Sequence, residues 1–568
     1  MSPRAYLSAA IVIIITWSLL VAIANTADIG CGRDTDRSGA VDVACSLVDA
    51  DFDGYNSVAD GGTDCDDTNW TIYPGIVTDS GCGANEYRTC QAGGTYTACA
   101  ATSGYTCHSG SGATYWVDEA QTDCTGTGTY ASPEDYRCWF NTAMTGYHAP
   151  VAGDCIVFQA GTYTASWSSS PVRQIYVSTI SGTAANPIRL RGEPGLAVVL
   201  TGAGTSPNHV RPIQLTMSDY WTIDFGSDGQ KPGLEIDGNF AGDGILIDGA
   251  HNATIRNVYV RDTDGNFGTD NIGGIKIQSS ANNATISHVH LKNNGGTGGL
   301  TNRNNTQMDI FRGNGHNIEY STLEATSATG SLFFYKHGDP GAIDWTFKGN
   351  ILNGGSYACL DASQGGAAIS RNLLLSCGGI AMNFEGGHGR TYFESNSVIE
   401  FNTINQDFPI HLFTKETYEQ SSTFGTVTIR KNIFRDDRAS SYSADGSTGF
   451  IRICHYCSDA IYTNLITGGK ISINQNCEYN SNAVALFYSE MAATSSDDPA
   501  AGNTGTSYAN FAAWQAAGYD TSSYSENPSL DSTYRATSAN CTNWGWRTPA
   551  DAPVVTYNWG SHPAILAQ

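Results

Sequence analysis

From about residue 244 the chain repeats one unit: a short β-rich run, a turn, and a second β-rich run with a polar residue near its start. Apolar runs at a regular period of roughly 30 residues, with Gly and Asn turns and no helical pattern between them, are typical of a β-solenoid. One coil cannot bury its own apolar face, so we expect the coils to stack around one continuous core. The middle residues of the aligned second runs are Asn257, His288, Tyr320, Asn350, Asn372, Asn402, Asn432 and Asn464.

Five of these positions form a column of asparagines. Stacking would bring their amides to one corner of successive coils, where they can hydrogen-bond along the stack as side-chain ladders do in cross-β structures. Asn also tolerates the left-handed turn conformation. We therefore interpret the column as structural rather than glycan-binding; it consists of Asn350, Asn372, Asn402, Asn432 and Asn464.

Charge and composition narrow the class of partner. Only 15% of the residues are charged, Gly is abundant at 64 residues, and the formal net charge is -25. Phosphate binding needs a basic surface, so we do not expect a nucleic-acid partner. An acidic polymer would need a local basic patch on this acidic chain.

The N-terminus and the cysteines indicate export. Residues 1–24 resemble a signal peptide, with Arg4 before an apolar run that ends in Ala22-Ile23-Ala24. An uncleaved membrane anchor is the alternative, because the run is about as long as a short spanning helix. The 16 cysteines are even in number, and ten of them fall between Cys31 and Cys155. This usage predicts disulfides and a secreted or cell-surface location, although the connectivity is not evident from the sequence.

An acidic segment over residues 25–75 alternates carboxylates and then turns at glycine. Alternate oxygen ligands followed by a Gly turn let a short loop wrap a hard cation. The segment resembles the thrombospondin type 3 family and related bacterial surface repeats, including the element Ile72-Tyr73-Pro74-Gly75. This resemblance implies bound Ca²⁺, and the alternative is a solvated acidic linker. The implied ligands are Asp49, Asp51, Asp53, Asp64, Asp66 and Asp67.

The remainder resembles the pectate-lyase-like family over roughly residues 114–541, which implies a right-handed parallel β-helix. We therefore expect an all-β chain with a signal peptide (1–24), a calcium-binding segment (25–75), a Cys-rich linker (76–113), the β-helix (114–541) and a C-terminal tail (542–568). The fold hosts lyases, hydrolases and adhesins, so it does not by itself define the function. The motifs that carry the resemblance include Tyr115-Trp116-Val117-Asp118, Gly153-Asp154-Cys155-Ile156-Val157, Gly192-Glu193-Pro194-Gly195 and Phe511-Ala512-Ala513-Trp514.

Outward positions of the first run in each coil predict a column of charged side chains along which a linear polymer can lie. In alginate-lyase-like and chondroitinase-B-like enzymes, which the chain resembles, a Lys/Arg pair performs β-elimination. By this resemblance we expect Arg312 and Lys336 to be the catalytic pair, with His337 as a further acid or base. The expected substrate-binding residues are Lys276, Asp361, Glu385 and Lys415.

The sequence leaves other uses of the column open. Asp361 and Glu385 could instead form the carboxylate pair of a glycosidase, and charged residues on a solvent face often serve only solubility. The first hypothesis is a secreted protein that binds and cleaves an acidic extracellular polysaccharide. The second is a non-catalytic surface adhesin or structural spike with a calcium-stabilised spacer.

Overall fold

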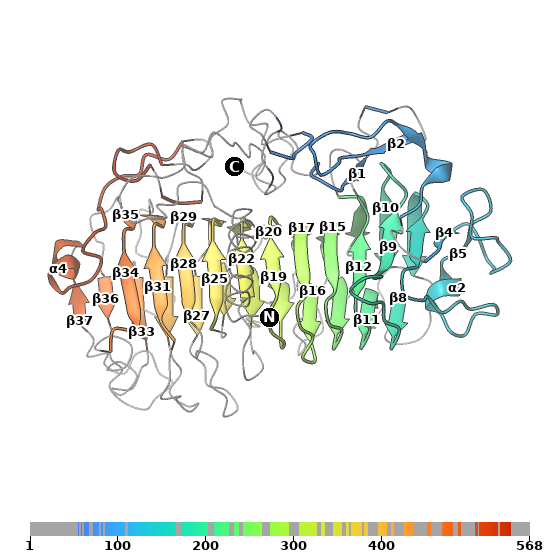
Figure 1. Cartoon of the computed structure of the whole chain (residues 1–568). Coiled ribbons are helices and arrows are strands. Elements are labelled where there is room, and N and C mark those ends of the chain that lie inside the picture. The colour runs from blue at the N-terminus through green and yellow to red at the C-terminus, as the bar shows by residue number, and fades with distance from the viewer. Residues whose placement is uncertain are drawn as a thin grey trace, which may run out of the picture.

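The computed structural model describes residues 55–546 with internal gaps, of which the longest are 295–305, 384–395, 414–424, 437–450, 456–467 and 490–505. Two large sheets run along the length of the described chain, and the strands of each lie side by side in register (Figure 1). Successive coils add one strand to a 12-stranded sheet and a pair of strands to a 22-stranded sheet. The body is therefore the parallel β-helix that the repeat predicts.

The 12-stranded sheet takes the first strand of each coil, and its pairings are parallel except the last, β36 with β37. Its strands are β8 (Val172–Ser178), β11 (Val210–Thr216), β14 (Ile245–Asp248), β16 (Gly273–Gln278), β18 (Thr306–Ile310), β21 (Phe333–Tyr335), β24 (Leu360–Ala362), β27 (Ile380–Asn383), β30 (Ile410–Phe413), β33 (Ile451–His455), β36 (Phe487–Ser489) and β37 (Thr506–Tyr508).

The 22-stranded sheet bends at a corner in every coil, and its paired strands also run parallel. Its strands are β4 (Thr114–Asp118), β5 (Glu134–Asp135), β6 (Cys155–Phe158), β7 (Gly161–Ala165), β9 (Ile188–Gly192), β10 (Val198–Gly202), β12 (Trp221–Asp224), β13 (Leu234–Asp237), β15 (Thr254–Arg261), β17 (Thr285–Lys292), β19 (Asn317–Glu319), β20 (Thr322–Ala325), β22 (Trp345–Lys348), β23 (Ile351–Gly354), β25 (Ala367–Ser370), β26 (Leu373–Leu375), β28 (Ser397–Glu400), β29 (Thr403–Asn405), β31 (Val427–Arg430), β32 (Ile433–Asp436), β34 (Ile471–Asn474) and β35 (Cys477–Asn480).

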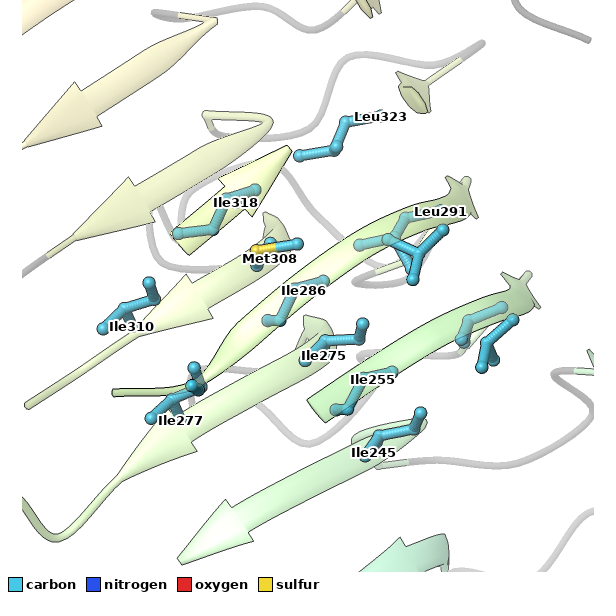
Figure 2. Close-up of a cluster of buried hydrophobic side chains, with 14 of the residues drawn as sticks. Ile245, Ile255, Ile275, Ile277, Ile286, Leu291, Met308, Ile310, Ile318 and Leu323 are labelled. Atoms are coloured by element: carbon cyan, nitrogen blue, oxygen red, sulfur yellow. The ribbon is translucent and has the colours of Figure 1, made fainter. Parts of the chain in front are cut away.

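The core is a stack of aliphatic side chains between the two sheets. Alternate residues of each strand point inward, so every coil contributes the same apolar positions to the stack. Figure 2 shows the result over successive coils, where Ile275 and Ile277 of β16 face Ile286 and Leu291 of β17. All four side chains are fully buried in one continuous cluster. Stacking thus satisfies the burial that a single coil cannot achieve.

The asparagine ladder is confirmed for four of its five predicted members. Nδ2 of Asn350 donates to Oδ1 of Asn372 at 3.1 Å, and the same contact links Asn372 to Asn402 at 2.9 Å and Asn402 to Asn432 at 3.0 Å. All four side chains are fully buried. The next rung is Asn476, which accepts from Nδ2 of Asn432 at 3.1 Å. Asn464, the predicted fifth member, lies outside the described residues.

The prediction that the ladder asparagines adopt the left-handed turn conformation is wrong. The left-handed residue is the one before each ladder asparagine, for example Arg371 at φ 55° and Lys431 at φ 57°. The aligned column is also shifted by one residue in the earlier coils: Glu319 pairs with Lys348, which sets Ser321 rather than Tyr320 opposite Asn350. Ser321 therefore meets the ladder, and its backbone N–H donates to Oδ1 of Asn350 at 3.0 Å.

The N-terminal Cys-rich segment folds as a small antiparallel sheet of β1 (Val77–Thr78), β2 (Glu86–Thr89) and β3 (Ala100–Ala101), followed by the short 3-10 turn η3 (Thr102–Gly104). This sheet lies against one end region of the β-helix near β9, β10 and β12 (Figure 1). Tyr73 supplies the contact, because its hydroxyl donates to Oδ1 of Asn257 at 2.9 Å and its ring stacks on His288 at 4.0 Å. A further link is the Cys107–Cys155 disulfide.

Twelve of the sixteen cysteines form disulfides in the described residues, in agreement with the predicted disulfide framework. The pairs are Cys65–Cys90, Cys82–Cys99, Cys107–Cys155, Cys124–Cys138, Cys359–Cys377 and Cys477–Cys541. The pairs are mostly local, at sequence separations of 14 to 64 residues.

Two short helices, α2 (Arg137–Phe140) and α4 (Phe511–Ala516), lie near the two ends of the solenoid (Figure 1). Within the described part of the chain, no helix is long and apolar enough to cross a membrane. The expected signal peptide lies outside that part. At the C-terminal side, Trp546 packs on the outer face of β23 and β26 against Ile351 and Leu373.

Candidate functional site

The strongest candidate site is a column of four side chains on the outer face of the 12-stranded sheet. Strand pairing sets Lys276 of β16 opposite Asp309 of β18, Asp309 opposite Phe334 of β21, and Phe334 opposite Asp361 of β24. Neighbouring parallel strands are about 4.8 Å apart, so this register places one cation and two carboxylates within four successive coils. Lys276 and Asp361 thus share the column that the sequence predicts for them.

These four side chains point away from the core, because the residues on either side of each one belong to the buried aliphatic stack. They are nevertheless shielded: the exposed fraction is 8% for Lys276, 0% for Asp309, 8% for Phe334 and 6% for Asp361. Charged side chains are rarely buried in proteins unless they are paired or functional. Electrostatic interactions inside such a shielded row are stronger than at an open surface.

Arg312 is placed differently from its expected position. It follows the end of β18, two residues beyond the last paired residue Ile310, and its side chain is exposed. Asp309 occupies the register position opposite Lys276 instead. Arg312 therefore lies at the edge of the sheet, past the strand ends.

The other expected site residues lie outside the described residues. Lys336 and His337 directly follow Tyr335, the last residue of β21. Glu385 follows the strand β27, and Lys415 follows β30. The described register therefore includes two of the seven predicted catalytic and substrate-binding residues in the column, with Arg312 just beyond a strand end.

Asp309 is a site residue that the sequence analysis did not single out. Its strand reads Met308-Asp309-Ile310, and the flanking apolar residues are fully buried. The sequence analysis assigned Arg312 to the column because it is charged. The register of a buried strand is set instead by its alternating apolar residues. Aligning Ile275-Lys276-Ile277 with Met308-Asp309-Ile310 on their apolar residues is the signal that identifies Asp309.

A second charged cluster lies on the 22-stranded sheet. His290 of β17 stacks on Tyr259 of β15 at 4.5 Å, and its Nε2 lies 3.5 Å from Oε1 of Glu324. Nζ of Lys292 lies 2.5 Å from the same Glu324 oxygen. Burial lowers the pKa of His290 and raises the pKa of Tyr259. Burial alone would raise the pKa of Glu324, but His290 and Lys292 outweigh it and lower that pKa.

This second cluster is a neutralised ion pair rather than a reactive centre. Glu324 is charged and shared between Lys292 and a histidine that burial keeps neutral. A base poised for proton transfer needs a pKa near the working pH, and the pKa values of His290 and Glu324 are both lowered away from it. We therefore do not assign catalysis to this cluster.

Two of the six expected calcium ligands fall in the described part of the chain. Asp64 is buried at 2% exposure, and its Oδ1 accepts the backbone N–H of Asp66 at 3.1 Å. Cys65 between them is tied to Cys90 by a disulfide. Two carboxylates on one short constrained turn suit a hard cation, which prefers oxygen ligands. Asp49, Asp51, Asp53 and Asp67 lie outside the described residues, and calcium binding stays a prediction.

No group of three or more His, Cys, Asp or Glu side chains suited to a metal occurs among the described residues. A complete site in the acidic segment would thus need ligands from residues 49–53 and 67, where the sequence predicts them.

Comparison with known proteins does not assign this chain to a family. No protein-family model and no curated protein matches the chain. Among solved structures, pectate lyase Pel9A is 14% identical with a TM-score of 0.36, covering 58% of this chain and 78% of that one. The alginate lyase from Paenibacillus sp. str. FPU-7 is 13% identical with a TM-score of 0.29, covering 57% of this chain and 88% of that one.

A third solved structure, the PL6 family polysaccharide lyase Pedsa3628 from Pseudopedobacter saltans, is 13% identical with a TM-score of 0.34 and covers 72% of this chain and 96% of that one. Scores at this level do not carry over an activity or a site. The assignment of this chain to the parallel β-helix fold rests on its own strand pairing.

Proposed function

We propose that this protein is an exported β-helix protein that binds an acidic extracellular polysaccharide and cleaves it by β-elimination. The observation that carries the proposal is the shielded column in which Lys276 pairs in register with Asp309, with Asp361 two coils further on. A linear polymer laid along the sheet would meet one such position per coil.

β-Elimination in a uronate polymer makes three demands. The carboxylate of the sugar must be neutralised, the proton at C5 must be taken by a base, and the C4–O bond must break as the leaving oxygen gains a proton. Lys276 is the cation of the described column and suits the first task. Asp309 is fully buried beside Lys276 and would hold its ammonium group in place, whereas Asp361 would accept hydrogen bonds from sugar hydroxyls.

The base and the acid are assigned from the sequence. Lys336 and His337 follow β21, the strand adjacent to β18, and Arg312 follows β18 itself. Residues that follow neighbouring parallel strands emerge at the same edge of a sheet. In this proposal Lys336 takes the C5 proton, His337 supplies the proton to the leaving oxygen, and Arg312 holds the polymer at the edge.

Activity is tested by incubating the full-length protein with alginate, pectate or chondroitin and following the ultraviolet absorbance of the unsaturated uronate product. Lys276→Met should lower kcat/KM by about a hundredfold or more, because a preorganised charge on the developing anion is removed. Lys336→Ala should abolish turnover, since no base then remains at the C5 proton. Lys348→Met, on the outer face of the other sheet, is the matched control and should retain activity.

Two results separate the proposal from its alternative. If Lys276→Met and Lys336→Ala both turn over substrate at the wild-type rate, as the control Lys348→Met should, the column takes no part in the mechanism. Glycan binding without any product, unchanged by Lys276→Met, would favour the adhesin. In the adhesin hypothesis the acidic segment acts as a spacer, whereas Tyr73 and the Cys107–Cys155 disulfide hold the adjoining residues against the β-helix.

A further inference from the structure

A pair of buried carboxyl groups closes the C-terminal end of the β-helix. Asn476, the last rung of the asparagine ladder, meets Asp520 where the next coil would begin. Nδ2 of Asn476 donates to Oδ1 of Asp520 at 3.3 Å, and Oγ of Ser523 donates to the same oxygen. Ser523 Oγ also accepts the backbone N–H of Asn476 at 2.6 Å. Asp520 thus replaces the ladder amide that a further coil would supply.

The second oxygen of this aspartate has no such donor. Asp520 is 1% exposed, and its buried Oδ2 has no hydrogen-bond donor among the residues that the structure describes. A buried carboxylate oxygen without a donor loses its hydration and gains nothing in return, which destabilises the folded state. Native structures rarely leave such a group unsatisfied.

Glu478 brings a second carboxyl group to the same place from a different strand. It pairs in register with Phe434 of β32, which in turn pairs with Ile404 of β29, so it occupies an inward, core-facing position. Its exposed fraction is 2%, and among the described residues neither Oε1 nor Oε2 has a donor group; the facing carboxyl group of Asp520 is the polar group within hydrogen-bonding reach. Burial, together with the facing Asp520 carboxyl group, raises the pKa of Glu478 well above its usual range.

Counting the unsatisfied oxygens distinguishes two ways to stabilise the pair. A single shared proton would join one Glu478 oxygen to Oδ2 of Asp520 and leave the other Glu478 oxygen buried without a donor. A cation held by both Glu478 oxygens and by Oδ2 of Asp520 satisfies all three. We propose that Glu478 and Asp520 bind one hard divalent cation of the calcium class at the C-terminal end of the β-helix.

Charge balance supports a divalent ion. No ion pair found in the described part of the chain involves Glu478 or Asp520. Two ionised carboxylates at this depth are stable only when an equal positive charge accompanies them. Ca²⁺ accepts bidentate and monodentate carboxylates together with neutral oxygens, and backbone carbonyls of the surrounding turns can complete its coordination.

This site differs from the acidic N-terminal segment in place and in role. It lies at the opposite end of the solenoid, beside α4 and the stacked rings of Trp514 and Tyr519. A bound ion there would tie β35 to the closing segment 519–524 and end the asparagine ladder. Occupancy should therefore affect the unfolding of the C-terminal coils rather than polysaccharide turnover.

The test compares metal content in the full-length protein. Wild type, Glu478→Gln and Glu478→Leu are dialysed against buffer with micromolar calcium, and bound calcium per chain is measured by elemental mass spectrometry. Both variants should lose about one equivalent relative to wild type. Glu478→Leu continues the apolar column of Ile404 and Phe434 and so keeps a folded variant available if the amide destabilises the core. Glu400→Gln, a carboxylate paired with Arg430 near the surface of β28, is the control and should keep wild-type content.

Thermal unfolding provides the second measurement. Adding calcium to the chelated wild type should raise its Tm more than it raises that of Glu478→Leu, because the variant lacks this site. Equal calcium content in wild type and both Glu478 variants would overturn the proposal. If, in addition, Glu478→Gln unfolds at a higher temperature than wild type at pH 8, a shared proton explains the pair, because removing that proton destabilises only the wild type.

Discussion

The hydroxyl of Tyr73 lies 2.9 Å from Oδ1 of Asn257, which joins two residues 184 positions apart. Nδ2 of Asn257 in turn donates to Oδ1 of Asp224 at 2.7 Å, and Asp224 also binds the guanidinium groups of Arg256 and Arg191. Burial alone would disfavour the charged form of Asp224, but the two arginines outweigh it and lower its pKa to about 2. The N-terminal segment is thus anchored to a largely shielded charged network on the outer face of the 22-stranded sheet.

Removing this anchor should release the N-terminal segment. Tyr73→Phe keeps the ring stacked on His288 but leaves Oδ1 of Asn257 without its donor, so we expect a loss of about 1 kcal/mol. Tyr73→Ala also removes the buried ring and should cost about 3 to 5 kcal/mol. Differential scanning calorimetry and limited proteolysis of the full chain measure both effects. If wild type and Tyr73→Ala resist protease equally, Tyr73 does not anchor the N-terminal segment. The control is Tyr147→Phe, which removes the hydroxyl of a partly exposed ring.

The centre of the asparagine ladder should be intolerant of substitution. Asn402 donates through Nδ2 to Oδ1 of Asn432 and to the carbonyl of Ile369, and its Oδ1 accepts from Asn372. Asn402→Ala leaves several buried partners unsatisfied at about 1 to 3 kcal/mol each, so Tm should fall by many degrees. Calorimetry checks this against Asn540→Ala, whose exposed side-chain amide donates to Glu526. A shift no larger than that of the control would show that the ladder contributes little stability.

Stability should decline as the pH falls from 7 to 5, in part because of His316. Burial lowers the pKa of His316 to about 3, below the unfolded value near 6.5. As the pH falls, His316 therefore takes up a proton in the unfolded chain before it does so in the folded chain. The stability that is present above about pH 6.5 is lost as the pH falls toward 3. For this histidine alone the loss at pH 5 is about 2 kcal/mol.

The contribution of His316 is isolated by His316→Asn, whose Oδ1 can still accept the backbone N–H of Ala284 as Nδ1 does. The slope of unfolding free energy against pH, measured with urea between pH 5 and 7, should be shallower in this variant. His251→Asn is the matched control, because Nδ1 of that partly exposed histidine accepts the N–H of Asn282 in the same way. An identical slope in wild type and His316→Asn would rule out this origin of acid sensitivity.

The acidic segment should bind calcium in the full-length protein. Asp49→Asn/Asp51→Asn should remove saturable calcium binding at millimolar concentration from this segment, as followed by calorimetry, because two carboxylate ligands lose their charge. Calcium should also lower protease cleavage within residues 49–67 in wild type and not in this variant. Comparison with Glu478→Leu separates this site from the C-terminal one. Each variant should lose the calcium ion of its own site and keep the calcium bound at the other site.

The repeat in the sequence is by itself enough to determine the architecture. The short β-rich runs repeat their apolar residues with a period near 30 residues. One coil cannot bury these side chains alone, so the coils must stack to bury them. The same logic identifies four rungs of the asparagine ladder, because an amide at one corner is useful only when the next coil repeats it. Lys276 and Asp361 can likewise be assigned to one column, because alternation along a strand is visible in the residues themselves.

Tertiary structure decided the register and the long-range partners. The apolar alternation around Asp309 indicates that it lies opposite Lys276, but the strand pairing decided this position, since a shift of a few residues leaves the period unchanged and alters which charges meet. The insertion after Asn432 moved the next rung to Asn476, 44 residues later, which a regular spacing could not reveal. The contact of Tyr73 with Asn257 and the meeting of Glu478 with Asp520 join segments through space. Such contacts depend on how the coils and the chain ends pack, and the local sequence pattern carries no information on that packing.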